Sequence, residues 1–212
     1  MATILVTAFE PFGGEDRNPA LDAMRALPET IAGTHIATRV VPTEFNRSIR
    51  VVTEAIEKTQ PVAVLAIGQA GGRAAVTPER VAINLDDARI PDNAGVQPLD
   101  QPIVAAGPAA YFSTLPVKAM VQAIRAAGVP AELSHTAGTY VCNHLLYGIL
   151  HHLRDSHTRG GFVHVPYASE QVAGCADTPS LPLDSIVTAL TAAIEAIVKN
   201  DEDIALVAGT TH

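Results

Sequence analysis

Short apolar runs rich in Val and Ile alternate along this chain with segments of helical spacing, and this alternation limits the fold more than any other feature. The first run, residues 2–8, ends at a loop rich in glycine and proline, which is typical of a buried strand that ends at the surface. Asn18 and Pro19 follow, and these residue types begin helices, so we expect a helix up to residue 27.

The same order of strand and helix recurs along the rest of the chain. The expected strands are 2–8, 35–41, 62–67, 131–134 and 161–165, and the expected helices are 19–27, 46–59, 116–127, 141–153 and 182–199. Such an order predicts an α/β fold in which helices cover both faces of a mostly parallel twisted sheet, a three-layer α/β/α arrangement. We expect a single domain over residues 1–212, with site residues directly after strands, because ligands bind beyond the carboxyl ends of parallel strands.

Composition excludes several classes of protein. With 48% hydrophobic and 17% charged residues, the chain is typical of a folded protein rather than a disordered one. Its 14 Lys and Arg against 22 Asp and Glu leave a net charge of −8, which does not supply the positive field that nucleic-acid binding needs. No apolar run reaches the roughly 20 residues that span a bilayer. We expect no nucleic acid or membrane partner.

The expected location is the cytoplasm. The first ten residues lack the basic start and apolar core of an export signal. The chain has only two cysteines, too few for a disulfide framework, and we expect both to stay reduced thiols.

Cys142 lies at the start of an expected helix. With Thr139 as the helix cap, Cys142 falls in the first turn, where free backbone N–H groups and the positive helix end favour a thiolate and can hold an oxyanion. This placement favours a nucleophile. The alternative is a small buried apolar residue in register with Leu146 and Leu150. Cys175 has no helix start or base beside it, and we expect it to take no part in chemistry.

A thiol nucleophile needs a base that also protonates the leaving amine, and imidazole suits this because its ordinary pKa is about 6.5. Of the eight histidines, only His164 lies in a clear strand near its carboxyl end. The alternative is a strand histidine that only hydrogen-bonds the backbone. The histidines weighed as zinc ligands are His144, His151, His152 and His157. Their spacings match no familiar zinc pattern, so we expect no metal.

Glu79 begins a stretch, residues 78–85, in which apolar residues alternate. The residues expected on the same face as Glu79 are Val81, Ile83 and Leu85. A carboxylate buried among them needs a partner. A histidine partner would give the nucleophile, base and orienting acid of a triad. An ion pair with Arg80, Arg89 or another arginine is the alternative.

Residues 86–108 have no clear periodicity and contain four prolines. Irregular segments of this length in compact domains usually serve a function or are mobile. We therefore expect this segment to be irregular and either functional or mobile.

Four blocks of the sequence, taken together, resemble the pyroglutamyl-peptidase family, also called pyrrolidone-carboxylate peptidases. The blocks are residues 6–14 with Asn18-Pro19, residues 78–84 continuing to 88–93, residues 138–143, and residues 161–166. The resemblance covers residues 4–171, and residues 167–170 match the usual pattern less well. It implies a cysteine omega-peptidase that removes N-terminal pyroglutamate from peptides, with Glu79, Cys142 and His164 as a triad and a thioester acyl-enzyme. It also implies that no cofactor is needed and that the chain forms a homo-oligomer, a tetramer.

The implied substrate group is a flat, uncharged lactam, so its pocket needs apolar faces and a few fixed polar groups. In keeping with the family, Phe9 and Phe12 are expected to supply the faces, although both are also suited to anchor a loop in the core. Gln69 is expected at the polar edge of the lactam, and Arg89 beside the oxyanion. Asn18 is assigned to the same pocket, with a role only as a helix cap as its alternative.

Two other functions stay open from the sequence. A nucleoside phosphorylase-like enzyme is one, since a related α/β architecture can host phosphate chemistry. The other is a non-catalytic binder of pyroglutamyl peptides, which would bind them without turnover.

Overall fold

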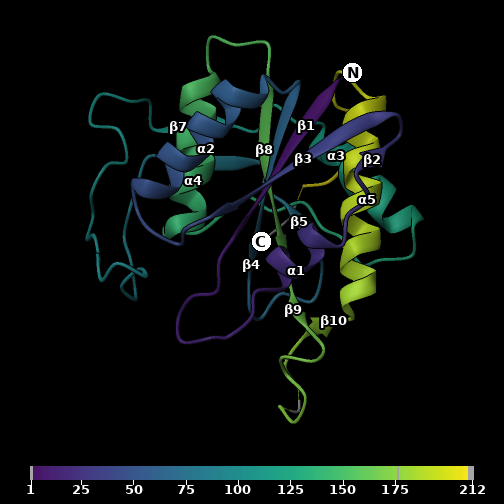
Figure 1. Cartoon of the computed structure of the whole chain (residues 1–212), viewed down its shortest axis with the longest axis horizontal. Helices are drawn as coiled ribbons and strands as arrows, with labels where there is room; N and C mark the ends of the chain where they lie inside the picture. The colour runs from purple at the N-terminus through teal and green to yellow at the C-terminus, as the bar shows by residue number, and fades with distance from the viewer. Residues whose placement is uncertain (1, 176, 210–212) are drawn as a thin grey trace.

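Four parallel strands form the centre of the sheet in the computed structural model, which describes residues 2–175 and 177–209 (Figure 1). They are β1 (Thr3–Phe9), β3 (Thr34–Val41), β4 (Ala63–Gln69) and β8 (Arg159–Val165), paired in the order β3-β1-β4-β8. The short strands β2 (Thr30–Ile31) and β5 (Thr77–Pro78) pair antiparallel at the two edges. Every residue of β4 is buried, as expected for a parallel strand that is covered on both faces.

Within the described residues, five helices cover the two faces of this sheet. One side carries α1 (Pro19–Arg25), α3 (Val117–Ala126) and α5 (Leu183–Lys199), and the other carries α2 (Arg47–Thr59) and α4 (Val141–Leu153), seen to the left of the sheet in Figure 1. Neighbouring strand residues point to opposite faces, so Leu65 joins the core under α3 and α5 whereas Val64 joins the core under α4. The predicted α/β/α fold with a mostly parallel sheet is confirmed.

Two small sheets lie outside the main one. β6 (Val81–Ile83) pairs antiparallel with β7 (Ala110–Phe112), and β9 (Tyr167–Ala168) pairs with β10 (Ser180–Leu181). Within the described ranges, no helix combines the length and the apolar character that crossing a bilayer would require.

The strand predicted at residues 131–134 is wrong. This segment makes only two isolated bridges, from Ala131 to Val76 and from Ser134 to Glu79. Pro78 lies between the two bridged positions and has no N–H to donate, so a continuous ladder cannot form there.

The predicted alternation over residues 78–85 is also wrong. Ala82 is fully buried, whereas Val81 and Ile83 are half-buried. The reason is that β5 ends at Pro78 and β6 begins at Val81 in a different sheet, so the alternation restarts between them. Glu79 lies in the gap and is fully buried, and its N–H donates to the carbonyl of Phe162 in β8 at 2.9 Å.

Candidate active site

Cys142 and His164 meet at the carboxyl end of the parallel strands. His164, near the end of β8, is the Cα partner of Gly68 on β4, and neighbouring strands lie about 4.8 Å apart. A Cβ atom at Gly68 would lie 3.1 Å from Cys142 Sγ and 2.7 Å from Phe162 Cζ, so a larger residue would push against both. The thiol therefore packs against the sheet at Gly68, the strand partner of His164. Both residues line one cavity of about 270 Å³.

The start of α4 places Cys142 in the first turn, as predicted, but the cap differs. The capping residue is Tyr140, with an extended backbone, and not Thr139. Thr139 instead donates its hydroxyl to the carbonyl of Asp87 at 2.7 Å, which holds the neighbouring loop. The first amide bonded within the helix is that of His144, to Tyr140 O at 3.1 Å. The Cys142 N–H has no partner among the described residues, so it is free to hold an oxyanion.

Asn143, next to the cysteine, fixes the start of α4. Its Oδ1 accepts the Ile83 N–H at 3.0 Å, and its Nδ2 donates to the carbonyls of Ile83 and Leu85 at 2.9 and 3.0 Å. Three hydrogen bonds from one buried side chain tie the helix end to β6 and the residues after it. Spacing alone gave no signal for this role.

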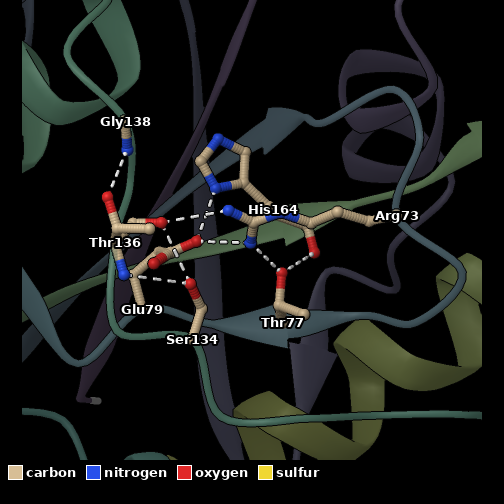
Figure 2. Close-up of polar contacts among 7 residues, drawn as sticks. All are labelled: Arg73, Thr77, Glu79, Ser134, Thr136, Gly138 and His164. Carbon is tan, nitrogen blue, oxygen red and sulfur yellow. Dashed lines mark hydrogen bonds and ion pairs between the residues drawn. The ribbon is translucent and has the colours of Figure 1, made fainter. Parts of the chain in front are cut away.

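Glu79 contacts a histidine and an arginine at once (Figure 2). Its Oε1 lies 2.7 Å from His164 Nδ1 and 2.6 Å from an Arg73 nitrogen, and the side chain is 0% exposed. Because a carboxylate only accepts, Nδ1 carries the proton and Nε2 keeps its lone pair. No described residue hydrogen-bonds to Nε2. The sequence offered a histidine and an arginine as alternatives, and the structure has both.

Arg73 was not singled out from the sequence. Arg80 and Arg89 were the arginines named for Glu79, and neither forms an ion pair with it. Arg73 follows β4 after the Gly71-Gly72 turn, so its place directly after a strand was the one signal that could have found it.

The charges of the pair follow from its surroundings. Burial alone would raise the pKa of Glu79, but the hydrogen bond from His164 and the positive charge of Arg73 outweigh burial and lower it. Burial lowers the pKa of His164, against the opposing effect of Glu79. The resting pair is therefore an ionised carboxylate and a neutral imidazole, the form that can accept a proton.

The surroundings of Cys142 act on the pKa of its thiol. Cys142 is half-buried in a dense environment, and burial, with a smaller effect of Glu79, raises the pKa of its thiol to about 12. Arg73 opposes this rise. Loss of water around the sulfur therefore works against the preference of a helix start for a thiolate. A base must therefore take the proton during attack.

The cavity gathers three of the five residues assigned to the substrate. It is lined by Phe12, Gln69, Asp87, Arg89, Ile90, Ala137, Thr139, Tyr140, Cys142 and His164. Phe9 lies behind it in the core, with its ring centroid 6.4 Å from that of Phe162. Asn18 caps α1, where its Oδ1 accepts the Ala20 N–H at 3.0 Å. Direct substrate contact by Phe9 or Asn18 stays a prediction.

The irregular segment 86–108 contributes three of these lining residues, Asp87, Arg89 and Ile90. It forms no helix or strand and makes one bridge, from Asp86 to Gln101. Its length and lack of periodicity predicted a functional or mobile segment, and they did not single out Asp87 or Ile90.

Two of the other histidines, His144 and His151, have different partners. His144 Nδ1 lies 2.7 Å from Asp86, and His151 Nδ1 lies 2.8 Å from the Tyr111 hydroxyl. In residues 2–175 and 177–209, no three His, Cys, Asp or Glu side chains are grouped so that they could hold a metal ion.

A larger cavity, of about 740 Å³, lies between α3 and α5. Alanines and threonines line much of it, with Glu195 and Lys199, and no cysteine or histidine takes part. Volume alone therefore does not mark the reactive site.

Comparisons of sequence point in one direction. Residues 2–200 match the family model described as pyroglutamyl peptidase. A protein named pyrrolidone-carboxylate peptidase 1 from Photorhabdus laumondii is 52% identical over 220 residues, and one of the same name from Ralstonia nicotianae is 53% identical over 215. Both matches cover 100% of this chain and 100% of the relative.

Comparisons of structure agree with those of sequence. Pyroglutamyl peptidase I from Bacillus amyloliquefaciens superposes with a TM-score of 0.92 at 46% identity, covering 96% of this chain and 100% of that one. Pyrrolidone carboxyl peptidase from Thermococcus litoralis does so with a TM-score of 0.92 at 34% identity, covering 97% and 99%.

Proposed function

The chain belongs to the pyroglutamyl peptidase family, and we propose that it removes N-terminal pyroglutamate from peptides with Cys142, His164 and Glu79 as its catalytic triad. The family makes the chain a peptidase. One arrangement supports the assignment of residues: Cys142 and His164 line the same cavity, the Cys142 sulfur packs at Gly68, the strand partner of His164, and Nδ1 of that histidine is held by a fully buried carboxylate.

The first half of the reaction forms a thioester. His164 Nε2 takes the thiol proton as Cys142 Sγ attacks the carbonyl carbon that joins pyroglutamate to the next residue. The Cys142 N–H and Arg89 stabilise the negative oxygen that forms. When the carbon–nitrogen bond breaks, the imidazolium returns its proton to the departing amine, and the shortened peptide leaves.

The second half consumes water. Neutral His164 removes a proton from a water molecule as that water attacks the thioester carbonyl. The carbon–sulfur bond breaks, the proton returns to the sulfur, and free pyroglutamate leaves. Glu79 keeps the proton on Nδ1 and stabilises the imidazolium in both halves, and it does not react itself.

Cavity chemistry supports a lactam as the bound group. Phe12, Ile90 and Ala137 offer apolar side chains for the faces of an uncharged ring. The Gln69 amide offers a polar contact, and its Oε1 is held by Gln171 Nε2 at 3.2 Å. A pocket of this kind needs no charge to hold pyroglutamate, since the lactam carries none.

We also propose the cellular setting. Cys142 and Cys175 are free thiols, and a thiol nucleophile suits the reducing cytoplasm. The assignment of residues 1–212 to a single peptidase domain rests on the alternation of strands and helices along the chain, and the homotetramer rests on the family resemblance. Light scattering of the purified protein would measure the number of subunits.

A hydrolysis assay with matched substrates tests the proposed function. Pyroglutamyl, prolyl and alanyl amides of one fluorophore are compared, and only the pyroglutamyl amide is expected to release it. Acid quenching during turnover should trap one pyroglutamyl group on the peptide that contains Cys142. Equal cleavage of the prolyl amide would contradict lactam specificity. Binding of a pyroglutamyl peptide with no release would instead identify a non-catalytic binder, and phosphate-dependent cleavage of nucleosides a phosphorylase-like enzyme.

A further inference from the structure

Arg73 lies at the centre of the polar cluster drawn in Figure 2 and contacts three separate parts of the chain. One guanidinium nitrogen bonds Glu79 Oε1 at 2.6 Å and also contacts the Thr77 hydroxyl. The other terminal nitrogen donates to the carbonyl of Thr136 at 3.0 Å. None of the proposed chemical steps assigns this side chain a task.

Each contact leads to one member of the proposed triad. Glu79 is the acid. Thr77 is the β5 residue paired with His164 in β8, so it adjoins the strand that carries the base. Thr136 belongs to the loop before α4, where its hydroxyl accepts the Gly138 N–H at 3.1 Å. That loop leads directly to the helix start that carries Cys142.

We propose that Arg73 is a positioning residue of the active site: it pins Glu79 Oε1 against His164 and fixes the loop at residues 134–139 that precedes Cys142. This inference rests on the proposed triad. A planar guanidinium suits the task, because its fork of donors can hold a carboxylate and a carbonyl in fixed directions.

The carboxylate of Glu79 needs such a clamp. His164 and Arg73 both bond Oε1, whereas Oε2 is buried and has no hydrogen-bond partner among the described residues. A carboxylate this deeply buried and held on one oxygen only is costly unless a cation stays beside it. Without Arg73, Glu79 would be free to rotate or to take up a proton, and either change would remove the orientation of His164.

The charge of Arg73 provides a signature that a purely structural role would not give. The charged or titratable groups around His164 are Glu79, Arg73 and Cys142, with Asp87, Arg89 and Tyr140 lining the same cavity. Arg73 lowers the pKa of both Glu79 and His164. Its loss should raise both, so protonation should inactivate the enzyme at a higher pH than in the wild type.

The test measures kcat/KM for a pyroglutamyl amide against pH in Arg73→Met, Arg73→Lys and Arg80→Met. Arg80 is the matched control, since it follows Glu79 in the chain and forms no ion pair among the described residues. Arg73→Met should lose about 10- to 100-fold in kcat/KM at neutral pH through misplacement of the acid and base. The acid limb of its pH profile, where kcat/KM is lost as the pH falls, should move to higher pH. Arg73→Lys keeps the charge, so it should keep the wild-type acid limb while recovering part of the rate, and Arg80→Met should match the wild type.

Two outcomes would overturn the inference. One is an Arg73→Met profile that falls evenly at all pH values with its acid limb unmoved, which would show a structural role only. The other is an unchanged rate. If Arg73→Met does not fold, the test rests on Arg73→Lys alone. A wild-type rate in Arg73→Lys would show that the guanidinium fork is not needed, which would overturn the inference. The Cys142→Ser variant distinguishes a failure of this inference from a failure of the proposed triad. Its activity should be lost whether or not Arg73 is a positioning residue.

Discussion

Two histidines of this enzyme are buried and donate Nδ1–H to a carboxylate at the same distance, yet only one has a second ring nitrogen without a hydrogen-bond partner among the described residues. His164 lies 2.7 Å from Glu79, and His144 lies 2.7 Å from Asp86. Both rings are almost fully buried, at 3% and 1% exposure. By burial and by carboxylate partner alone, the two pairs cannot be told apart.

The second ring nitrogen separates them. His144 Nε2 accepts the Asn46 N–H at 2.8 Å, so its lone pair is already used. His164 Nε2 has no hydrogen-bond partner in the described part of the chain, and its residue lines the cavity with Cys142. A buried histidine–carboxylate pair is therefore not a sign of catalysis by itself. The role proposed for His164 rests on its unpartnered Nε2 and on the cavity that it shares with Cys142.

The pair of His144 and Asp86 has a structural task instead. It ties α4 to Asn46 at the start of α2, a residue whose φ of 59° is rare outside glycine. A neighbouring carboxylate, Asp92, accepts the Phe45 N–H at 2.8 Å. These contacts hold a strained turn and the segment after Asp86 against the two helices.

The sharpest test of this contrast is to remove each imidazole in turn. His164→Gln removes the base, and kcat should fall about a millionfold, as in other triads that lose their base. The folded His144→Phe variant should keep kcat/KM within about tenfold of the wild type, because His144 touches no reacting atom. Stopped assays on the pyroglutamyl amide measure both. A loss in His144→Phe as large as that in His164→Gln would erase the distinction.

The two carboxylates should differ in the same way. Glu79→Gln should lower kcat by about 10⁴-fold, less than loss of the base, because Glu79 orients and does not react. Asp86→Asn should change kcat far less. If the Glu79 variant lost as much activity as His164→Gln, or as little as Asp86→Asn, its assigned role would be wrong.

The pair of His144 and Asp86 should matter for the stability of the fold rather than for catalysis. His144→Phe keeps a ring against Phe45 but leaves the buried Asp86 carboxylate and the Asn46 N–H without a partner. The free energy of unfolding should fall by about 3 kcal/mol, the usual cost of breaking a buried pair. Urea unfolding measures this change. A stability equal to that of the wild type would mean that the pair is not needed to hold the fold.

The smallest expected effect concerns the pH dependence of kcat/KM, which reports the protonation of His164. Only neutral His164 can accept the thiol proton, and burial lowers its pKa from the ordinary value of 6.5. The wild-type kcat/KM should therefore persist as the pH falls through 6.5 and be lost only below it. Glu79 opposes that lowering, so Glu79→Gln should move the acid limb to still lower pH. A wild-type midpoint above 6.5 would contradict a buried neutral base.

The sequence predicted well what depends on patterns within one segment. The bounds of the helix 141–153 were predicted to the residue, because its apolar residues recur at helical spacing and nothing interrupts them. Cys142 in its first turn and His164 at the end of a strand followed from those patterns. The blocks that carry the family resemblance then joined Glu79 to them.

Contacts between distant segments were out of reach. Arg73 meets Thr136 across 63 positions in the chain, and no local pattern records that. The raised pKa of the Cys142 thiol could not be predicted for a similar reason, since the groups that exclude water from it come from several elements. Thr139 failed as a cap because the carbonyl of Asp87, 52 positions away, accepts its hydroxyl instead.

The identity of the nucleophile is the claim on which the rest depends, and a pair of cysteine substitutions tests it most directly. Cys142→Ser and Cys175→Ser are compared for release of a fluorophore from a pyroglutamyl amide, with circular dichroism to confirm that each is folded. Cys175 is exposed and serves as the matched control. Cys142→Ser should give no detectable release, and Cys175→Ser should give wild-type release. Wild-type release by a folded Cys142→Ser would contradict the assignment of Cys142 as the nucleophile.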